Sequence, residues 1–587
     1  MKICLIPQVS INAAYPRYSL PYVPLGLLSI AGMFSPQEHK IEVIDLTLLV
    51  RNGSIKYGRD FEKTAARLIH SKKCDLVGFS TFSACFHHTL KIATELKKIS
   101  PETTIVFGGP QATFCANDIL KNFPVDIIVR GEGETTFKEL TGALETGSSL
   151  ANIQGISYRN GKNIIVNPGR PLIEDINTLP LPAYHLYPVY PNTKVPIEMT
   201  RGCPFHCTYC ATARYWGKRT RRKSVERAFL EMRFLSNIFN TSTIVFVDDT
   251  FITNRAQVIE LCHKLIKEKN EIKWRCSTRI NTVNKELLKL MSKAGCTGIF
   301  YGIESGSPKI QRSIKKDIDL KCVTRTLKAT AAEKIGLTAS FIIGFPEETI
   351  EEIKMTLRLQ DEIKKAFSDK QSIRFHILSC DVNTELSETY KKDLLYDGFH
   401  SDQAGGIYLS FDKRMLLRYK EMFLGCYYIR AKHVKREMLK YLYHFLFDGF
   451  MMAYWSSLYV SLAKNDPLHL FMKWHKAPTP VKSRPESENL VKQIYSFFAS
   501  FFNGPDIPLP VRELYRHETE ISPIKKTGGF DTYTVTYQYD PEITIEAIRK
   551  GAKDLQRLPK SPVMYRYSVI PAEGELPSTG YVRVRTS

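Results

Sequence analysis

The chain has 587 residues, of which 43% are hydrophobic, a composition typical of a globular protein. This length predicts about three or four domains, and no run of about 18 uncharged apolar residues occurs, so no transmembrane span is expected. The net charge of +22 favours an anionic partner, such as a phosphate-bearing cofactor or an acidic peptide. Because no RNA-binding signature is present, a nucleic-acid partner is not expected.

Residues 1–150 alternate strand-like runs with amphipathic helical segments. Such alternation predicts a doubly wound parallel sheet, which binds its ligand beyond the carboxyl ends of the strands. No G-x-G-x-x-G follows the first strand, so a dinucleotide is not favoured. The expected strands are 3–6, 41–44, 76–79, 104–107 and 126–129. Candidate cofactor-binding residues at their ends are Ser80, Thr81, Gly108, Gly109, Gln111, Gly131, Glu132 and Gly133.

A linker with a hairpin signal around Asn160-Gly161 is expected over residues 151–190. Strand–helix units then recur over residues 191–385 and predict a partial (β/α)6 barrel of the TIM type. In such barrels the chemistry takes place at the carboxyl ends of the strands. The expected strands are 196–200, 243–247, 273–276, 298–303, 338–343 and 373–378.

Three cysteines, Cys203, Cys207 and Cys210, follow the first of these strands with the spacing C-x3-C-x2-C, and no fourth cysteine lies nearby. Four thiolates complete a cubane iron–sulfur cluster, whereas three leave one iron open to a small ligand. A structural zinc site is the alternative, but His206 adjoins Cys207 and is poorly placed to share its metal.

Disulfides are not expected, because the 13 cysteines are an odd number without a paired framework. Cys4 and Cys74 lie in apolar runs and are expected to be small buried hydrophobic residues. The chain starts with a strand-like run rather than a secretory signal, which favours a reducing cytoplasm.

The cysteine loop and the barrel pattern resemble the radical S-adenosylmethionine (SAM) superfamily. The resemblance implies that Cys203, Cys207 and Cys210 bind a [4Fe-4S] cluster whose open iron binds SAM. Arg275 and Arg279 are candidates for the SAM carboxylate, or equally for structural roles. The residues that the resemblance assigns to SAM, together with Arg275, are Tyr209, Asp249, Glu304, Ser305, Gly344 and Phe345.

The N-terminal region resembles the cobalamin-binding domain that precedes some radical SAM domains. The resemblance rests on the runs 24–28, 108–113 and 130–134. The D-x-H-x-x-G motif, whose histidine ligates cobalt in other cobalamin proteins, is not found. The resemblance therefore implies cobalamin without a protein histidine on its lower face.

The C-terminal third is expected to contain a helical region at 386–480 packed on the barrel, a linker at 481–510, and a small α+β module at 511–587. A dense basic run, 218–223, follows the cysteines. It either faces a cofactor or acidic substrate, or is simply solvated.

Together the resemblances imply a cobalamin-dependent radical SAM methyltransferase that methylates an unactivated carbon, or phosphorus, of a natural product or peptide. A cyclisation, a ring contraction and a non-catalytic cobalamin or iron–sulfur sensor are the alternatives. A flavodoxin or ferredoxin is the expected electron donor. No catalytic side chain is predicted.

Overall fold

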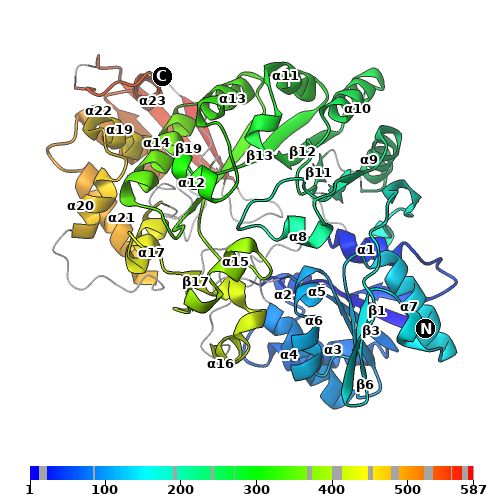
Figure 1. Ribbon diagram of the computed structural model, residues 1–587. Helices are drawn as coiled ribbons and strands as arrows, with labels where there is room; N and C mark the ends of the chain where they lie inside the picture. Colours follow the sequence, from blue (N-terminus) through cyan, green and yellow to red (C-terminus); the bar gives the residue numbers. More distant parts are fainter. Residues whose placement is uncertain are drawn as a thin grey trace. The chain divides into compact units, whose positions relative to one another are not determined.

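The computed structural model of the chain divides into two compact units (Figure 1). The first unit contains residues 1–278, 293–296 and 379–429, and the second contains residues 279–292, 297–378 and 430–587. The structure describes residues 1–11, 23–82, 86–188, 195–239, 243–269, 271–366, 373–399, 413–446, 454–476, 488–520, 533–556, 558–570 and 580–585.

The N-terminal region is a seven-stranded sheet with the order β2-β1-β3-β4-β5-β6-β7. Its first five strands are parallel, as the sequence predicted, and their 2-1-3-4-5 order is that of a doubly wound fold. Helices α3 and α4 lie on one side of the sheet, and α1 and α7 on the other (Figure 1). The bounds are β1 Lys2–Ile6, α1 Leu25–Ala31, β2 Lys40–Val43, α3 Phe61–Ser71, β3 Leu76–Ser80, α4 Phe86–Ile99, β4 Thr104–Gly108, β5 Ile127–Val129 and α7 Glu134–Thr146.

The expected hairpin is present as β6 (Ile156–Asn160) and β7 (Asn163–Val166), turning at Gly161 with φ +60°. It continues the N-terminal sheet, because β6 pairs antiparallel with β5. An edge strand has unpaired N–H and C=O groups, and the hairpin satisfies those of β5.

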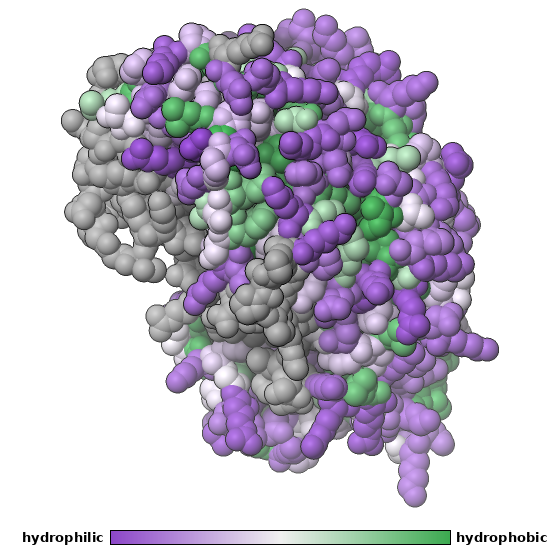
Figure 2. Space-filling model, turned by 90° about the vertical axis from the view of Figure 1, so that its left-hand side faces the viewer, coloured by the Kyte–Doolittle hydropathy of each residue, from purple (hydrophilic) through white to green (hydrophobic). Residues whose placement is uncertain are grey.

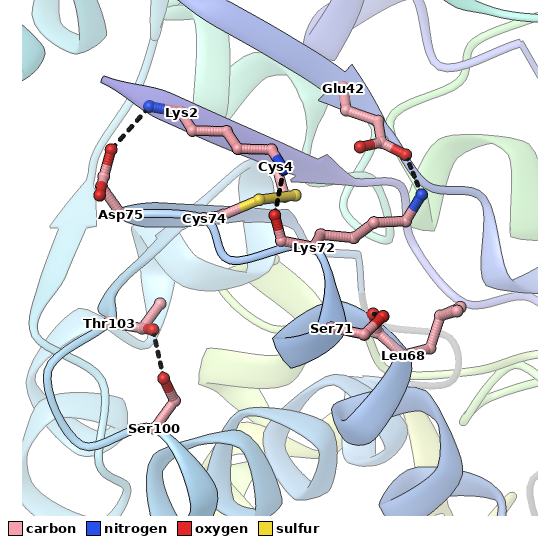
Figure 3. Close-up of a disulfide and its surroundings, with 10 residues drawn as sticks. All are labelled: Lys2, Cys4, Glu42, Leu68, Ser71, Lys72, Cys74, Asp75, Ser100 and Thr103. Carbon is pink, nitrogen blue, oxygen red and sulfur yellow. Dashed lines mark hydrogen bonds and ion pairs between the residues drawn. A yellow bond between two sulfur atoms is a disulfide. The ribbon is translucent and has the colours of Figure 1, made fainter.

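Cys4 and Cys74 form a disulfide, so the expectation of two separate buried cysteines is wrong (Figure 3). Ile3 pairs with Leu76, and this register brings the two cysteines to a Cα–Cα distance of 6.1 Å. Such a distance is within the range that a disulfide bridges. The two cysteines are 70 positions apart in the sequence and become neighbours only through strand pairing, so their spacing along the chain does not predict the disulfide.

All six strands expected between residues 191 and 385 are present, and the paired strands within each unit are parallel. In the first unit their order is β12-β11-β8, and in the second unit it is β15-β14-β13. Helices follow the strands, so the β/α expectation is confirmed. The bounds are β8 Val195–Ile197, α9 Val225–Phe239, β11 Thr243–Phe246, α10 Arg255–Lys267, β12 Lys273–Thr278, β13 Cys296–Glu304, α13 Leu320–Ala332, β14 Gly336–Ile343, α14 Ile350–Ala366 and β15 Ile373–Ile377.

Part of the C-terminal helical region packs on the N-terminal domain rather than on the barrel. The segment from α16 (Lys413–Arg418) to Cys426 belongs to the first unit. The ring of Phe423 lies 5.9 Å from that of Phe86, and the ring of Tyr419 lies 4.9 Å from that of Phe123. An aromatic-rich pattern predicts burial but not the surface that provides it, which is why the sequence prediction was wrong here.

The other C-terminal helices agree better with the expectation. In the second unit, α19 (Tyr454–Lys464) contacts α14, and the hydroxyl of Ser461 donates to Asp361 at 2.5 Å. The run 481–510 is not all linker, because α21 spans Glu488–Phe502. Its apolar face, including Leu490, Ile494 and Phe498, is fully buried.

The last part is a small α+β module, as expected. Its three strands form an antiparallel sheet of order β18-β19-β20. The bounds are α22 Leu509–Glu520, β18 Tyr533–Tyr537, α23 Pro541–Arg549, β19 Val563–Ile570 and β20 Gly580–Arg585. The first part of the expected linker, up to residue 487, lies outside the described residues.

On the face seen in Figure 2, hydrophilic side chains cover most of the described surface, with smaller hydrophobic patches among them. This agrees with a chain in which 24% of the residues are charged. Among the described residues, no helix is both long and apolar enough to cross a bilayer.

Candidate functional site

The three cysteines lie on a loop that starts and ends at one point. The loop connects β9 (Thr200–Arg201) with β10 (Arg221–Arg222), two short antiparallel strands in which Arg201 faces Arg221. The two ends of the loop 202–220 are therefore held side by side by this pair of strands, which forms the base of the loop. The short helix α8 (Thr212–Trp216) forms the second half of the loop.

Cys203, Cys207 and Cys210 are partly exposed, and none of them forms a disulfide. Burial raises the pKa of the Cys210 thiol, and the neighbouring Cys207 and Cys203 raise it further. Three thiolates at such close quarters repel one another, and bound iron relieves that repulsion. The donor set thus fits an iron–sulfur cluster.

The described residues contain no group of three His, Cys, Asp or Glu side chains that could hold one metal ion. A cubane does not require such a group, because each thiolate binds a different iron atom. A hydroxyl group also adjoins the cysteines, since Thr250 Oγ1 lies 3.5 Å from Cys203 Sγ. Hydrogen bonds to cluster sulfurs are one means of adjusting a reduction potential.

Gly202 shapes the entry to the cysteine loop. Its φ of +99° lies in the region that favours glycine, and a Cβ there would overlap the carbonyl oxygen of Arg219. The two ends of the loop therefore pass so close together that no side chain fits between them.

Two aspartates at the end of β11 support the loop. The buried carboxylate of Asp248 accepts from the backbone N–H groups of Met199, at 3.1 Å, and Thr200. Burial raises the pKa of Asp248 to about 7. The exposed Asp249, which the sequence assigned to SAM, accepts from the hydroxyl of Thr212 at 3.3 Å. Asp249 therefore lies beside the cysteine loop.

The base of the loop is held by a buried network of ion pairs. Arg201 binds Glu132, Glu134 and Glu198 at 2.7–2.8 Å, and Arg221 binds Glu132 at 2.7 Å. The Arg201 guanidinium lowers the pKa of Glu134 despite its burial. The basic run 218–223 is thus not simply solvated, because its Arg221 is buried in this network.

Other contacts join the cysteine loop to the N-terminal domain and to the segment after β15. The hydroxyl of Tyr215 donates to the carbonyl of Gly131 at 2.9 Å, and its ring lies 5.9 Å from that of Phe114. The N–H of Leu386 donates to the carbonyl of Thr208 at 2.9 Å. The cysteine loop therefore packs directly on the carboxyl ends of the N-terminal strands.

The residues predicted to bind cobalamin differ in how freely they could reach a ligand. The side chains of Thr81, Gln111 and Glu132 already bind protein atoms: Thr81 binds the Gly108 carbonyl at 2.8 Å, and Gln111 binds the Met422 carbonyl at 2.6 Å. The residues whose surroundings are more open are Ser80, which is partly exposed, and Gly131, where a Cβ would meet nothing within 4 Å.

The backbone of this region suits a bulky cofactor. Gly109 and Gly131 have φ values of +96° and +73°, and the former lies where a Cβ would press on the Thr81 carbonyl. Glycine turns at the ends of β4 and β5 let a ligand approach the main chain. The backbone of these glycine turns is therefore better suited to contact cobalamin than the side chains of Thr81, Gln111 and Glu132, which already bind protein atoms.

Four of the residues assigned to SAM lie in the second unit. Glu304, at φ +69°, is buried and pairs with Lys316 at 2.9 Å. Ser305 is fully buried, and its Oγ accepts from the N–H of Ser307 at 3.1 Å. Their side chains thus hold the turn that follows β13.

Gly344 and Phe345 form the turn after β14, and Glu348 holds it. Gly344 has φ +89°, and its N–H donates to the carboxyl of Glu348 at 2.6 Å. Phe345 is buried. Glu348 is completely buried, and burial raises its pKa to about 8. Glu348 is not among the site residues predicted from the sequence, since its burial is a tertiary property.

We expect Glu348→Gln to change how stability depends on pH. A carboxyl with a pKa of 4.5 unfolded and about 8 folded binds more protons when folded, so it loses stability as pH rises between these values. In urea unfolding, the free energy of unfolding of the variant relative to that of the parent protein should rise by about 2–4 kcal/mol between pH 5 and pH 8.5. The partly exposed Glu347→Gln is the control, and parallel profiles for parent and Glu348→Gln would contradict the prediction.

The arginine pair also differs in its surroundings. Arg279 donates to the carbonyl of Lys316 and is buried. Arg275, on β12 in the first unit, is partly exposed, and so is Tyr209 on the cysteine loop. Of the two arginines, Arg275 is therefore the better placed to bind a carboxylate from solution.

Comparison with known proteins agrees with this geometry. Residues 197–359 match the radical SAM superfamily, and residues 17–141 match the B12 binding domain. An uncharacterized methyltransferase from Pyrococcus horikoshii is 35% identical over 371 residues, covering 62% of this chain and 78% of that protein. The chain belongs to the cobalamin-binding radical SAM family. Its expected cofactors, a [4Fe-4S] cluster, SAM and cobalamin, are confirmed as those of the family.

Members with other chemistry are also similar to this chain. The anaerobic magnesium-protoporphyrin IX monomethyl ester cyclase of Synechocystis is 27% identical over 357 residues, covering 59% of this chain and 70% of that protein. The structure of TsrM from Kitasatospora setae, a radical SAM methyltransferase with cobalamin and a [4Fe-4S] cluster bound, aligns with a TM-score of 0.55 at 17% identity, over 67% of this chain and 78% of that chain. The chain is a radical SAM enzyme, and the prediction of a methyltransferase is confirmed at the level of the family.

Proposed function

We propose that this enzyme transfers a methyl group from methylcobalamin to an unactivated carbon, or phosphorus, of a natural product or peptide. The observation that carries the proposal is the direct packing of the cysteine loop on the crevice end of the N-terminal domain, through Tyr215 and Gly131. A methyl donor and a substrate radical must meet at one atom, so their binding loops have to adjoin. When bound, the cluster and SAM supply a radical, and cobalamin supplies the methyl group.

The roles of the protein residues follow from their positions. We propose that Cys203, Cys207 and Cys210 hold the cluster, and that Tyr209, Asp249 and Arg275 bind SAM from the first unit. Arg275 offers a fixed fork of donors for the carboxylate of SAM. We further propose that the turns at Glu304-Ser305 and Gly344-Phe345 take part in SAM binding, chiefly through their backbone.

The electron is proposed to come from a flavodoxin or ferredoxin. The partial exposure of the three cysteines supports this, because a small redox protein needs a short path to the cluster. Excess positive charge on the chain suits an acidic donor.

The second candidate is a cyclisation or other rearrangement without methyl transfer, which the cyclase relative favours. Anaerobic turnover with reductant and SAM labelled with deuterium in its methyl group separates the two. Methyl transfer after radical abstraction yields S-adenosylhomocysteine, 5′-deoxyadenosine and a labelled product. Production of 5′-deoxyadenosine together with an unlabelled, rearranged product would overturn the methyl-transfer proposal.

The search for a substrate can use the same reaction. Extracts of the source cells, incubated with the reconstituted enzyme and labelled SAM, should contain one compound that acquires the label. Mass spectrometry identifies that compound, and the Cys207→Ala protein serves as the blank.

A further inference from the structure

Glu132 occupies an unusual place in the buried network. Its Oε1 accepts from Arg201 Nη1 at 2.8 Å, and its Oε2 accepts from Arg221 Nη1 at 2.7 Å. The N–H of Ile173 donates to Oε2 at 2.8 Å. One carboxylate thus binds both arginines that face each other across the base of the cysteine loop.

The bonds of Glu132 are formed away from water. The side chains of Glu132, Arg201 and Arg221 are 4–5% exposed. Removing ions from water is costly, and the cost is recovered only where the geometry of the bonds is good. Planar guanidinium groups fix the direction of their bonds, so this network defines an orientation as well as a contact.

The position of Glu132 in the fold gives the network its meaning. Glu132 follows β5, at the carboxyl end of the parallel strands in the sheet of the cobalamin-binding domain. Arg201 and Arg221 are the residues on either side of the loop 202–220, which carries the cluster cysteines. The Tyr215–Gly131 hydrogen bond joins the same two loops at a second point.

We propose that Glu132 is a positioning residue that sets the separation and orientation of the iron–sulfur cluster relative to cobalamin. It does so by holding both ends of the cysteine loop on the cobalamin-binding domain. The inference deepens the proposed function, on which it rests. It also replaces the direct cobalamin contact predicted from the sequence, because protein donors already bind both carboxylate oxygens.

Positioning matters here because two cofactors serve one substrate atom. A displacement of about 1 Å can lower a rate about 100-fold in reactions that depend on alignment. A residue with a purely structural role would change stability or cofactor content. A positioning residue changes the relation between two cofactors that both remain bound.

The test compares Glu132→Gln with a matched control, Glu174→Gln. Gln keeps the shape of Glu but loses the charge that holds both arginines. Glu174 also pairs with an arginine of the cysteine loop, Arg219 at 3.3 Å, but this pair is exposed. Both proteins are reconstituted with iron, sulfide and cobalamin, and bound iron and cobalamin are measured first.

The decisive measurement is electron paramagnetic resonance of cob(II)alamin. Reduction of the cluster creates a second unpaired spin, whose distance and orientation determine how strongly the cob(II)alamin signal relaxes and broadens. We expect Glu132→Gln to bind both cofactors fully. The relaxation enhancement of the cob(II)alamin signal by the reduced cluster should nevertheless change in this variant, whereas Glu174→Gln should reproduce the parent spectrum. The measurement requires neither substrate nor methyl transfer, so it separates failure of this inference from failure of the proposed function.

Three results would overturn the proposal. The first is an unchanged enhancement in Glu132→Gln. The second is loss of cobalamin with the cluster retained, which would make Glu132 a cobalamin-binding residue. The third is the absence of any spin interaction in the parent protein. If Glu132→Gln does not fold, Arg201→Lys keeps the charge but loses the fork, whose three nitrogens bind Glu132, Glu134 and Glu198, and the same change in relaxation enhancement is expected of it.

Discussion

Cys207→Ala is expected to abolish the iron–sulfur cluster and, with it, SAM cleavage. The variant removes one of only three thiolates, and the remaining two hold too few irons to retain a cubane. Loss of a residue next to a metal ligand commonly costs about 10–100-fold in affinity or activity, so loss of a ligand should exceed about 100-fold. The measurements are the brown absorbance near ~400 nm, bound iron, and the rate of 5′-deoxyadenosine formation.

Two comparisons make this result specific. Cys322→Ala removes a partly exposed cysteine on α13 and should leave the cluster intact. Cobalamin binding by Cys207→Ala should be retained, because the N-terminal sheet has its own core around Leu5, Val106 and Phe137. A full cluster with undiminished SAM cleavage in Cys207→Ala would refute the assignment of this ligand.

Gly202→Ala is expected to have the next largest effect. Alanine at φ +99° is strained, and its Cβ would overlap the backbone carbonyl of Arg219, which cannot rotate away as a side chain could. We expect a loss of about 2–4 kcal/mol in unfolding free energy, or release of the cysteine loop and a fall in bound iron.

Gly217→Ala provides the matched control on the same loop. Gly217 also has a positive φ, +70°, but a Cβ there would meet nothing within 4 Å. Its cost should be only about 1–2 kcal/mol, from the left-handed backbone alone. Urea unfolding and iron analysis of both variants distinguish strain from overlap. Equal effects at the two positions would show that the overlap with Arg219 does not matter.

Much of the fold could be predicted from the order of apolar runs. Each expected strand of the N-terminal sheet, such as 76–79 or 104–107, lies within a residue of the observed one. Buried parallel strands read as continuous apolar runs, which is a local signal. The cysteine spacing is equally local, because a cluster loop takes its ligands from a few successive residues.

Burial partners could not be predicted in the same way. The aromatic pattern around Phe423 indicated a core, but not that this core is the N-terminal domain. The linker predicted at 481–510 contains the apolar helix α21, whose partners in the core lie elsewhere in the chain. A pattern of exposed and buried positions specifies an apolar face without specifying what covers it.

The sequence by itself determined the fold class and the family, because both depend on spacing along the chain, and it predicted the three cysteines of the cluster in the same way. Only the tertiary structure decided which groups each buried polar side chain binds. The carboxylate of Glu132, a predicted cobalamin-binding residue, lies between Arg201 and Arg221, 69 and 89 residues further along the chain. A charge buried in a protein must find partners, and those partners are chosen by the packing of distant segments rather than by neighbours in sequence.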